Sequence, residues 1–386
     1  MAAKADVVVI GAGVFGLSCA WNLARNGRKV IVLDRAPIGT EASGWALGRL
    51  DPLLKGSGST GSTEQDLPPG HIAKPVAQQE LALLSYRLHR EMTAEIESTS
   101  GIDLQVDEQP TLQLFYSDAD RKSGLQSAES WTSLGFKTEI LSAADITKID
   151  ARFAAPEYGG ALVQGPYFID SMRFVSALAA CAKQAGVRVE SATVTGIDAT
   201  GAAGASTVHT DQGHYEAATV IVAAGPWSNH LLQALGVDVP VHPSKGEILR
   251  LAPPRSGSFA THLHGPCSLV NKKDGMVWVA ATAADAGFDR SPSNEARERL
   301  LNSANLMMPD AGESEVLKHT VCFRPATPDD LPVVGRAGDT GSVIVATGGG
   351  GSGIMQCLYV GKLVEGMMSS DSSEPELASI SLGRFT

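Results

Sequence analysis

Three glycines near the start of the chain have the spacing of a dinucleotide-binding turn. Gly11, Gly13 and Gly16 directly follow the apolar run at 7–10 and precede a helical pattern. This spacing permits a tight turn, close approach of a pyrophosphate and close helix–strand packing, and the helix N-terminus then faces the phosphates. Asp34 ends the next apolar run, where its carboxylate can accept hydrogen bonds from ribose hydroxyls. The residues predicted to contact a dinucleotide here are Gly11, Gly13, Val14, Phe15, Gly16, Asp34 and Arg35.

A second glycine-rich segment lies late in the chain and has the chemistry of an anion-binding loop. Residues 348–353 are glycine except for Ser352, and a helical pattern follows from Ile354. A glycine loop that leads into a helix offers unhindered N–H donors and the positive end of the helix dipole. An ordinary turn is the simpler interpretation, since glycine permits tight turns anywhere. The residues predicted to bind a cofactor here are Gly349, Gly350, Gly351, Ser352, Gly353 and Ile354.

Two shorter segments add small residues that would let a ligand approach the backbone closely. They are Ala42-Ser43-Gly44 and the run AAGPWS at 223–228, of which Ala224 and Gly225 are the predicted contacts. Together the four segments let a cofactor approach the backbone closely at more places than NAD needs. An NAD-dependent dehydrogenase that uses only the N-terminal turn stays as an alternative, and a yellow or colourless protein solution distinguishes the two.

The elements that must position these residues follow a mixed α/β pattern. Residues 5–34 are typical of a strand, turn, helix and strand, and continuously apolar strands at 6–10 and 218–225 indicate a parallel sheet covered on both faces. Helices are predicted at 77–98 and 172–185, and a strand at 342–346 is followed by a helix at 354–367. Between 240 and 324, shorter alternating strands predict a separate antiparallel sheet.

Composition limits the classes of partner and of compartment. The 386 residues suggest two domains, and the net charge of -11 argues against nucleic acid as a partner. Five scattered cysteines show no metal-ligand or disulfide spacing, so we expect no metal site and a reducing cytoplasm. No run has the length of a membrane span or the pattern of a signal peptide, and assembly as a homo-oligomer is compatible with this composition.

Taken together, the motifs resemble the D-amino acid oxidase superfamily over nearly the whole chain, within it the glycine oxidase and monomeric sarcosine oxidase branch. The matching segments are 11–16, 42–44, 170–173, 223–228, 274–289 and 323–335. The resemblance implies FAD, a Rossmann-like FAD-binding domain of the glutathione reductase type and a substrate domain with a mainly antiparallel sheet. It implies a discontinuous FAD-binding domain at 1–85, 151–228 and 325–386, with 86–150 and 229–324 as the substrate domain.

The same resemblance assigns roles to single residues. It implies that Ser43 and Gly44 lie near the pyrophosphate and flavin, Val194 near the adenine, and 349–354 at the pyrimidine edge of the flavin ring. Arg324 matches the position that holds the substrate carboxylate, and a guanidinium fork suits that task. A structural salt bridge is the plainer role for this arginine.

The relatives carry a second cationic residue in the C-terminal loop, and this chain has glycines in that stretch. A cation elsewhere would have to supply that positive charge. Arg49 is the first choice, and the remaining candidates are Lys245, His242, His262 and His264. A lone histidine is more often structural than functional. Cys322 stands where sarcosine oxidases bond the flavin covalently, although non-covalent FAD and an inert buried thiol are favoured by the neighbouring residues 323–325.

The implied reaction is oxidation of the C–N bond of a small amino acid or amine such as glycine, sarcosine or a D-amino acid. Hydride transfer to flavin N5 would give an imine that hydrolyses, with reoxidation by O2. The alternatives are a dehydrogenase that passes electrons to a quinone or carrier, and a flavin-dependent tRNA-modifying domain. The Gly- and Ser-rich segment at 55–70 is predicted to be an exposed loop that closes over the site.

Overall fold

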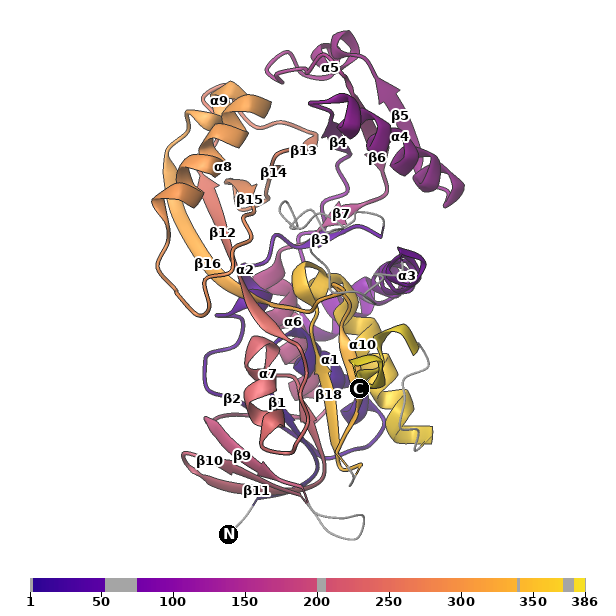
Figure 1. Ribbon diagram of the computed structural model, residues 1–386, viewed down its shortest axis with the longest axis vertical. Coiled ribbons are helices and arrows are strands. Elements are labelled where there is room, and N and C mark those ends of the chain that lie inside the picture. The colour runs from indigo at the N-terminus through magenta and orange to yellow at the C-terminus, as the bar shows by residue number, and fades with distance from the viewer. Residues whose placement is uncertain (1–2, 53–74, 200–205, 339–340, 371–377, 386) are drawn as a thin grey trace.

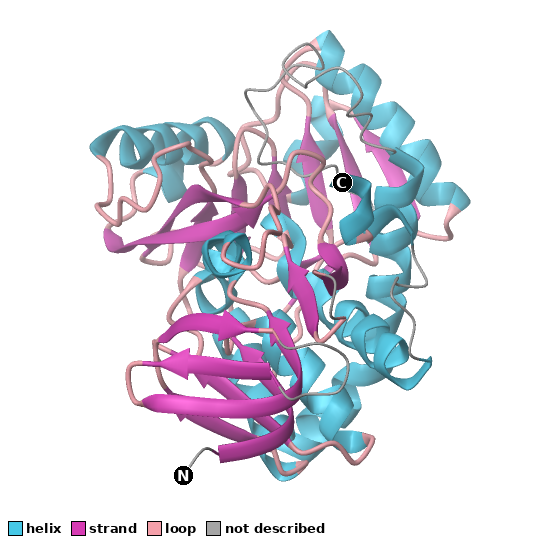
Figure 2. Cartoon of the chain, turned by 60° about the horizontal axis from the view of Figure 1, so that its bottom comes forward, coloured by secondary structure: helices cyan, strands magenta, loops and turns pink. Residues whose placement is uncertain are grey.

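The structure is a computed structural model that describes residues 3–52, 75–199, 206–338, 341–370 and 378–385. The predicted lid at 55–70 lies outside the described residues. Figure 1 shows one sheet in the lower half of the molecule and a second in the upper half, and Figure 2 shows the same chain turned about the horizontal axis. No helix in the described ranges is both long enough and apolar enough to cross a membrane.

The lower sheet has a parallel core, as the continuously apolar runs predict. Its strands follow the order β17 (Val333–Ala337), β18 (Val343–Thr347), β11 (Gly213–Val222), β1 (Ala3–Ile10), β2 (Val30–Asp34) and β8 (Arg188–Ser191), with β10 (Ser206–Thr210) and β9 (Val194–Asp198) continuing from β11. β1 runs parallel to both β2 and β11. The edge strand β17 is antiparallel to β18.

Both faces of this sheet are buried because alternate residues of β1 enter two different cores. Val7 and Val9 pack into one apolar cluster, and Val8 and Ile10 pack into the other. The first cluster is covered by α1 (Val14–Arg25), α3 (Pro75–Ser100), α6 (Ser171–Gln184) and α10 (Gly353–Ser370). The second is covered by α7 (Ser228–Gln233) and by β9 and β10. The predicted helices at 77–98 and 172–185 are confirmed as α3 and α6.

The upper sheet is antiparallel apart from one pair. Its order is β16 (Val316–Ala326), β12 (His242–Leu251), β15 (Val277–Ala280), β14 (Ser268–Asn271), β13 (His262–His264), β4 (Thr111–Leu114), β6 (Gly160–Gln164) and β5 (Lys137–Leu141). Only β13 and β4 among these neighbours run parallel. Four helices accompany this sheet, namely α4 (Asp118–Ser133), α5 (Ala143–Ile149), α8 (Asn294–Met307) and α9 (Pro309–Gly312). The division into domains stays a prediction, and β6 pairs within the upper sheet although its residues fall in the range assigned to the FAD-binding part.

The two faces of the upper sheet have different surroundings. One face buries leucines and valines such as Leu249 and Val279 in a core with α8 and α9. The face we call the inner face carries Arg324, Cys322, Gly246, Ile248, Ala280, Ser268 and His264, which cross-strand pairing places on one side. The short pair β3 (Arg49–Leu50) and β7 (Tyr167–Phe168) and the helix α2 (Ala42–Trp45) lie between the two sheets (Figure 1).

His89 of α3 connects the helical layer to the start of α10 and gives stability a pH dependence. Its Nε2 donates to the Ile354 carbonyl oxygen at 2.9 Å, and burial lowers the pKa of this imidazole to about 4. An unfolded histidine has a pKa of about 6.5, so below that pH the unfolded chain binds a proton that the folded chain excludes. Stability is therefore full above pH 6.5 and falls as the pH drops toward 4.

We expect His89→Gln, which keeps a donor but does not titrate, to lose less stability on acidification than the unmodified chain. Between pH 7 and pH 5 the difference should be roughly 2 kcal/mol. Urea unfolding at both pH values with equal free FAD measures it. His214→Gln, at an exposed position, serves as the control. Equal losses in His89→Gln and in the unmodified chain would contradict the expectation.

Candidate active site

The turn between β1 and α1 requires glycine at two positions for reasons of chain packing. Gly11 has φ +109°, and a Cβ there would lie 2.4 Å from the Ala223 carbonyl oxygen. A Cβ on Gly16 would lie 1.9 Å from the Gly11 carbonyl oxygen. The turn therefore packs directly on the end of β11, where the AAGPWS run begins.

Gly13 is different, because packing within the protein does not require a glycine there. Its φ is -77°, and a Cβ would meet only the Ser43 hydroxyl oxygen, at 3.1 Å. Gly13 is the N-cap of α1 and provides no side-chain cap, while Ser43 Oγ accepts from the Val14 N–H at 3.1 Å. The N-terminus of α1 is thus left open beside a hydroxyl, as a pyrophosphate site requires.

Asp34 is held at the end of β2 by two backbone donors. Oδ2 accepts from the Ala12 N–H at 2.7 Å and Oδ1 from the Ala36 N–H at 2.8 Å. The neighbouring Arg35 guanidinium lies 4.3 Å from the centre of the Trp227 ring in the AAGPWS run. Val194 begins β9 two residues after Ala192, whose N–H donates to the Asp34 carbonyl. The segments that contain Asp34, Val194 and the AAGPWS run therefore lie together near the turn between β1 and α1.

The late glycine loop packs against the same turn. It consists of Gly348 and Gly349, which follow β18, the 3-10 turn η2 (Gly350–Ser352) and the start of α10. A Cβ on Gly349 would lie 2.8 Å from Phe15 Cζ in the first turn of α1. Nothing lies within 4 Å of a Cβ on Gly351 or Gly353. Two helix N-termini from opposite ends of the sequence thus meet with open backbone between them, an arrangement that fits the pyrophosphate and the flavin ring of one FAD molecule.

Arg324 lies on the inner face of the upper sheet, on the strand that contacts η2 and α2. Its Nη1 donates to the Thr282 carbonyl oxygen at 2.8 Å. The guanidinium lies over Gly246, where a Cβ would come within 2.5 Å of Cζ. Gly246 is therefore needed for the guanidinium to cross β12, which is the second strand from one edge of the sheet.

Arg49 approaches the inner face from β3. Its Nη2 is 2.9 Å from Asp51 Oδ2 and its Nη1 is 3.4 Å from His264 Nδ1. Burial lowers the pKa of Arg49, and the Asp51 carboxylate partly offsets this. Burial, followed by the positive charge of Arg49, lowers the pKa of His264 to about 3. The structure brings these two predicted residues together, with His264 neutral.

Lys245 does not join them, because it lies on the opposite face of β12. Strand residues alternate between faces, and Lys245 pairs across the sheet with Phe323 while Ser244 pairs with Arg324. The Lys245 ammonium donates to Asp289 Oδ2 at 2.9 Å and to the Ser291 carbonyl at 2.6 Å. This correction removes Lys245 from the candidate substrate site.

The other candidate histidines have separate surroundings. His242 is exposed at the start of β12. His262 is fully buried, with Nε2 3.3 Å from Asp107 Oδ2 and its ring edge-on to Phe168. Cys322 lies on the inner face opposite Gly246, and burial raises the pKa of its thiol. A covalent link through Cys322 stays a prediction.

Three residues of the site have no motif in the sequence. Asp51 orients Arg49, and the Ser268 hydroxyl lies 3.0 Å from His264 Nδ1. The buried Lys272 ammonium donates to the carbonyls of Leu47 at 3.0 Å and Ile169 at 2.8 Å, and burial lowers its pKa to about 8. Lys272 thereby fixes the segment that leads to Arg49. Alternation of Arg49 and Asp51 in an extended segment is the only local signal for any of these contacts.

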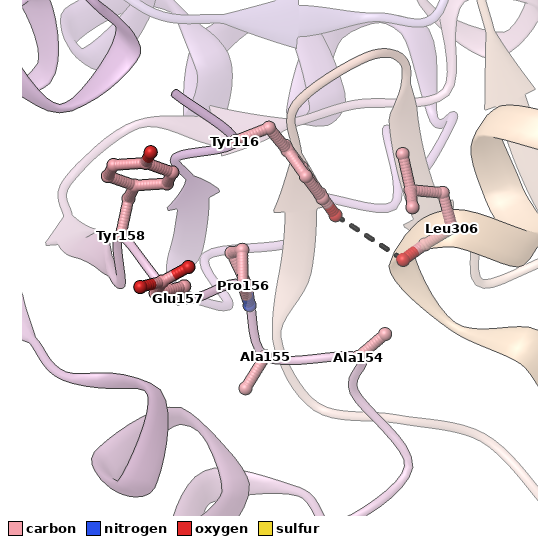
Figure 3. A pocket seen from close by; sticks show the side chains of 7 residues that line it. All are labelled: Tyr116, Ala154, Ala155, Pro156, Glu157, Tyr158 and Leu306. Atoms are coloured by element: carbon pink, nitrogen blue, oxygen red, sulfur yellow. Dashed lines mark hydrogen bonds between the residues drawn. The ribbon is translucent and has the colours of Figure 1, made fainter. Parts of the chain in front are cut away.

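Two surface hollows in the described part of the chain lie away from this site. One of about 390 Å³ is lined by Tyr116, Glu157, Tyr158, Leu306 and three small residues, and Figure 3 shows the Tyr116 hydroxyl directed at the Leu306 carbonyl. The other, of about 520 Å³, lies at the opposite end of β1 and β2 from the glycine turn. In the described residues no group of three or more His, Cys, Asp or Glu side chains has a metal-binding arrangement.

The fold and the two facing helix N-termini define a dinucleotide-dependent oxidoreductase. A model of the FAD dependent oxidoreductase family, DAO, matches residues 6–367. The chain therefore belongs to this family, is an oxidoreductase and uses FAD as its cofactor.

Similar proteins agree with this membership. Glycine oxidase of Bacillus licheniformis is 26% identical, with 97% of this chain and 96% of that protein covered. D-amino acid dehydrogenase of Rhizorhabdus wittichii is 27% identical, with 98% and 100% covered. The crystal structure of glycine oxidase from Geobacillus kaustophilus matches with a TM-score of 0.86 at 25% identity, covering 98% of both chains. The resemblance to the glycine oxidase branch is confirmed.

Proposed function

We propose that the chain oxidises the C–N bond of a small amino acid or related primary or secondary amine, with Arg324 as the anchor for the carboxylate. The observation that carries this proposal is the position of the Arg324 guanidinium over Gly246, on the strand that contacts the glycine loop before α10. Relatives named as glycine oxidase and D-amino acid dehydrogenase support the substrate class. The proposal includes a FAD-binding part at 1–85, 151–228 and 325–386, and a substrate part at 86–150 and 229–324.

Arg324 has donors left for a substrate. Thr282 accepts from Nη1, while the guanidinium carries five N–H donors in a fixed fork. A carboxylate bound by the remaining donors would be fixed in orientation, and the carbon next to it would be fixed with it. Ile248 and Ala280 are buried beside this position and offer an apolar floor that excludes water.

FAD, when bound, accepts two electrons and the hydrogen from the substrate carbon. The chain's own residues favour the neutral form of the amine, from which this hydrogen is lost. An amine must be neutral for its nitrogen lone pair to assist, and nearby positive charge lowers an amine pKa. Arg324 and Arg49 both carry such charge toward the inner face. The imine product then hydrolyses in water to a keto acid or an aldehyde.

Oxygen is the proposed electron acceptor, and a quinone or a protein carrier is the alternative. Mixing reduced protein rapidly with oxygenated buffer separates the two, because an oxidase reoxidises fast and a dehydrogenase slowly. A tRNA-modifying role is disfavoured by the net charge of -11, which repels a phosphate backbone.

The substrate class is tested by anaerobic addition of amines to the yellow protein. Glycine, sarcosine, D-amino acids, cyclic imino acids and aminophosphonates are compared by loss of visible flavin absorbance. At least one amine that carries an acidic group should bleach the flavin. If dithionite bleaches the protein and none of these amines does, the proposed function is wrong.

A further inference from the structure

The inner face of the upper sheet has a second polar end, opposite Arg324. The Arg324 head lies over β12, while Ser268 of β14 and His264 of β13 lie further along the sheet. Two strand spacings, about 10 Å, separate β12 from β14. The residues between them on this face, Ile248 and Ala280, are apolar. A small molecule with one polar group at each end would span this distance.

His264 presents a neutral N–H at this second end. An arginine can only donate, so the contact from Arg49 Nη1 makes His264 Nδ1 an acceptor and places the ring proton on Nε2. The Ser268 hydroxyl, 3.0 Å away, contacts the same Nδ1. Asp51 in turn orients Arg49 through the 2.9 Å ion pair. In the described part of the chain no hydrogen bond is formed by Nε2, which leaves its donor available to a ligand.

The strand beside His264 adds polar atoms that protein groups do not satisfy. Gln113 of β4 is the direct neighbour of His264 across the pair, and Thr111 is the neighbour of His262. Gln113 Oε1 and Thr111 Oγ1 are both buried, and neither has a hydrogen-bond partner among the described residues. Buried polar groups normally have partners, so these two oxygens can still accept hydrogen bonds from a ligand or a water molecule at this end of the face.

We propose that His264, Arg49 and Ser268 form a second anchor that selects amines bearing two carboxylates, an amino or imino dicarboxylic acid. The inference rests on the proposed function, since Arg324 holds the first carboxylate. The His264 Nε2–H would donate to the second carboxylate, while the Ser268 hydroxyl donates to Nδ1 and the Arg49 guanidinium supplies the positive potential behind the ring. Asp51 pairs with Nη2 of that guanidinium, whereas His264 is contacted by Nη1.

The test compares two substrates of equal size on the FAD-containing enzyme. Iminodiacetate carries two carboxylates, and N-isobutylglycine replaces one of them with an isopropyl group. We expect kcat/KM to favour iminodiacetate by about tenfold to a hundredfold, the value of one charge-assisted hydrogen bond. His264→Leu should bring this ratio close to one, and His264→Gln, which retains a donor, should preserve part of it. His214→Leu, at an exposed position on β11, should leave the ratio as it is.

A pH series gives a second readout. The charged groups at this end are Arg49 and Asp51 from the β3 segment, with the His262–Asp107 pair two residues along β13. Because His264 donates as a neutral ring, the ratio should stay constant from pH 6 to pH 9. A ratio that falls as the pH rises through neutrality would overturn the neutral-donor assignment.

The outcomes separate this inference from the proposed function. If N-isobutylglycine or another monocarboxylic amine bleaches the flavin and iminodiacetate has no advantage, the second anchor is wrong and the proposed function stands. An advantage that survives His264→Leu unchanged also overturns the second anchor. If no amine bleaches the flavin, both are wrong.

Discussion

Replacement of Arg324 by methionine is expected to lower kcat/KM for amino-acid substrates by about 30- to 5,000-fold. Loss of one partner from a buried charge pair costs roughly 2–5 kcal/mol, and each 1.36 kcal/mol is a factor of ten in rate. Methionine retains much of the length of the side chain over Gly246, so packing changes little. Steady-state rates with glycine, sarcosine and the best D-amino acid measure the effect, with FAD content read from the visible absorbance.

Two controls distinguish an anchor from a structural arginine. Arg324→Lys retains the charge but not the planar fork, so it should recover only part of the loss. An amine that lacks the carboxylate should be oxidised at a similar low rate by both variants and by the unmodified enzyme. If Arg324→Met slows that amine as much as it slows the amino acids, the role of Arg324 is the bond to the Thr282 carbonyl, and the anchor assignment is wrong.

The elements around the cofactor are those that local sequence rules predict best. Gly11 and Gly16 follow a buried strand, and Gly16 is required by its close contact with the carbonyl oxygen of the nearby Gly11. The apolar runs of β1 and β11 require burial on both faces, which only a covered parallel sheet supplies. The helix at α10 follows from its own glycine loop in the same way. The sequence predicts these features without knowledge of distant pairing, and the packing of Gly11 against Ala223 is the contact here that joins distant parts of the chain.

The inner face of the upper sheet could not be predicted in the same detail, because the residues that it carries depend on the registers between distant strands. Lys245 and Arg324 both suit a carboxylate, and only the pairing of β12 with β16 shows that they lie on opposite faces. A shift of one residue in that pairing would exchange the faces. The contact between Arg49 and His264 joins residues 215 positions apart, and nothing in either local sequence specifies it.

The dependence on pairing between distant strands also explains why the position of β6 could not be predicted. Its residues, 160–164, precede the helix α6 of the lower layer, and the range 151–228 that the resemblance implies for the FAD-binding part includes both. Its partners β4 and β5 come from earlier in the chain and carry it into the upper sheet. Chain connectivity alone does not decide which sheet a short strand joins.

Substitution of Gly16 by valine is expected to yield protein without FAD and with strongly reduced stability. A Cβ there would lie 1.9 Å from the Gly11 carbonyl oxygen, and the nearest atoms include backbone that cannot move without opening the turn. Overpacking of this kind costs roughly 1–3 kcal/mol or more, and the turn that would have to open is also the predicted pyrophosphate site. Visible absorbance after purification and thermal unfolding measure the two effects. Gly196→Val on β9, where a Cβ meets nothing within 4 Å, is the matched control.

Gly13→Ala separates the loss of cofactor from the loss of fold. The added methyl group would meet only the Ser43 hydroxyl, at 3.1 Å, and the φ of -77° is acceptable to alanine. The apoprotein should therefore unfold within about 1 kcal/mol of the unmodified apoprotein. Its affinity for added FAD should nevertheless fall, at least tenfold by fluorescence titration, because the methyl group occupies the approach to the N-terminus of α1. If Gly13→Ala binds FAD as tightly as the unmodified chain, the pyrophosphate does not lie at this turn.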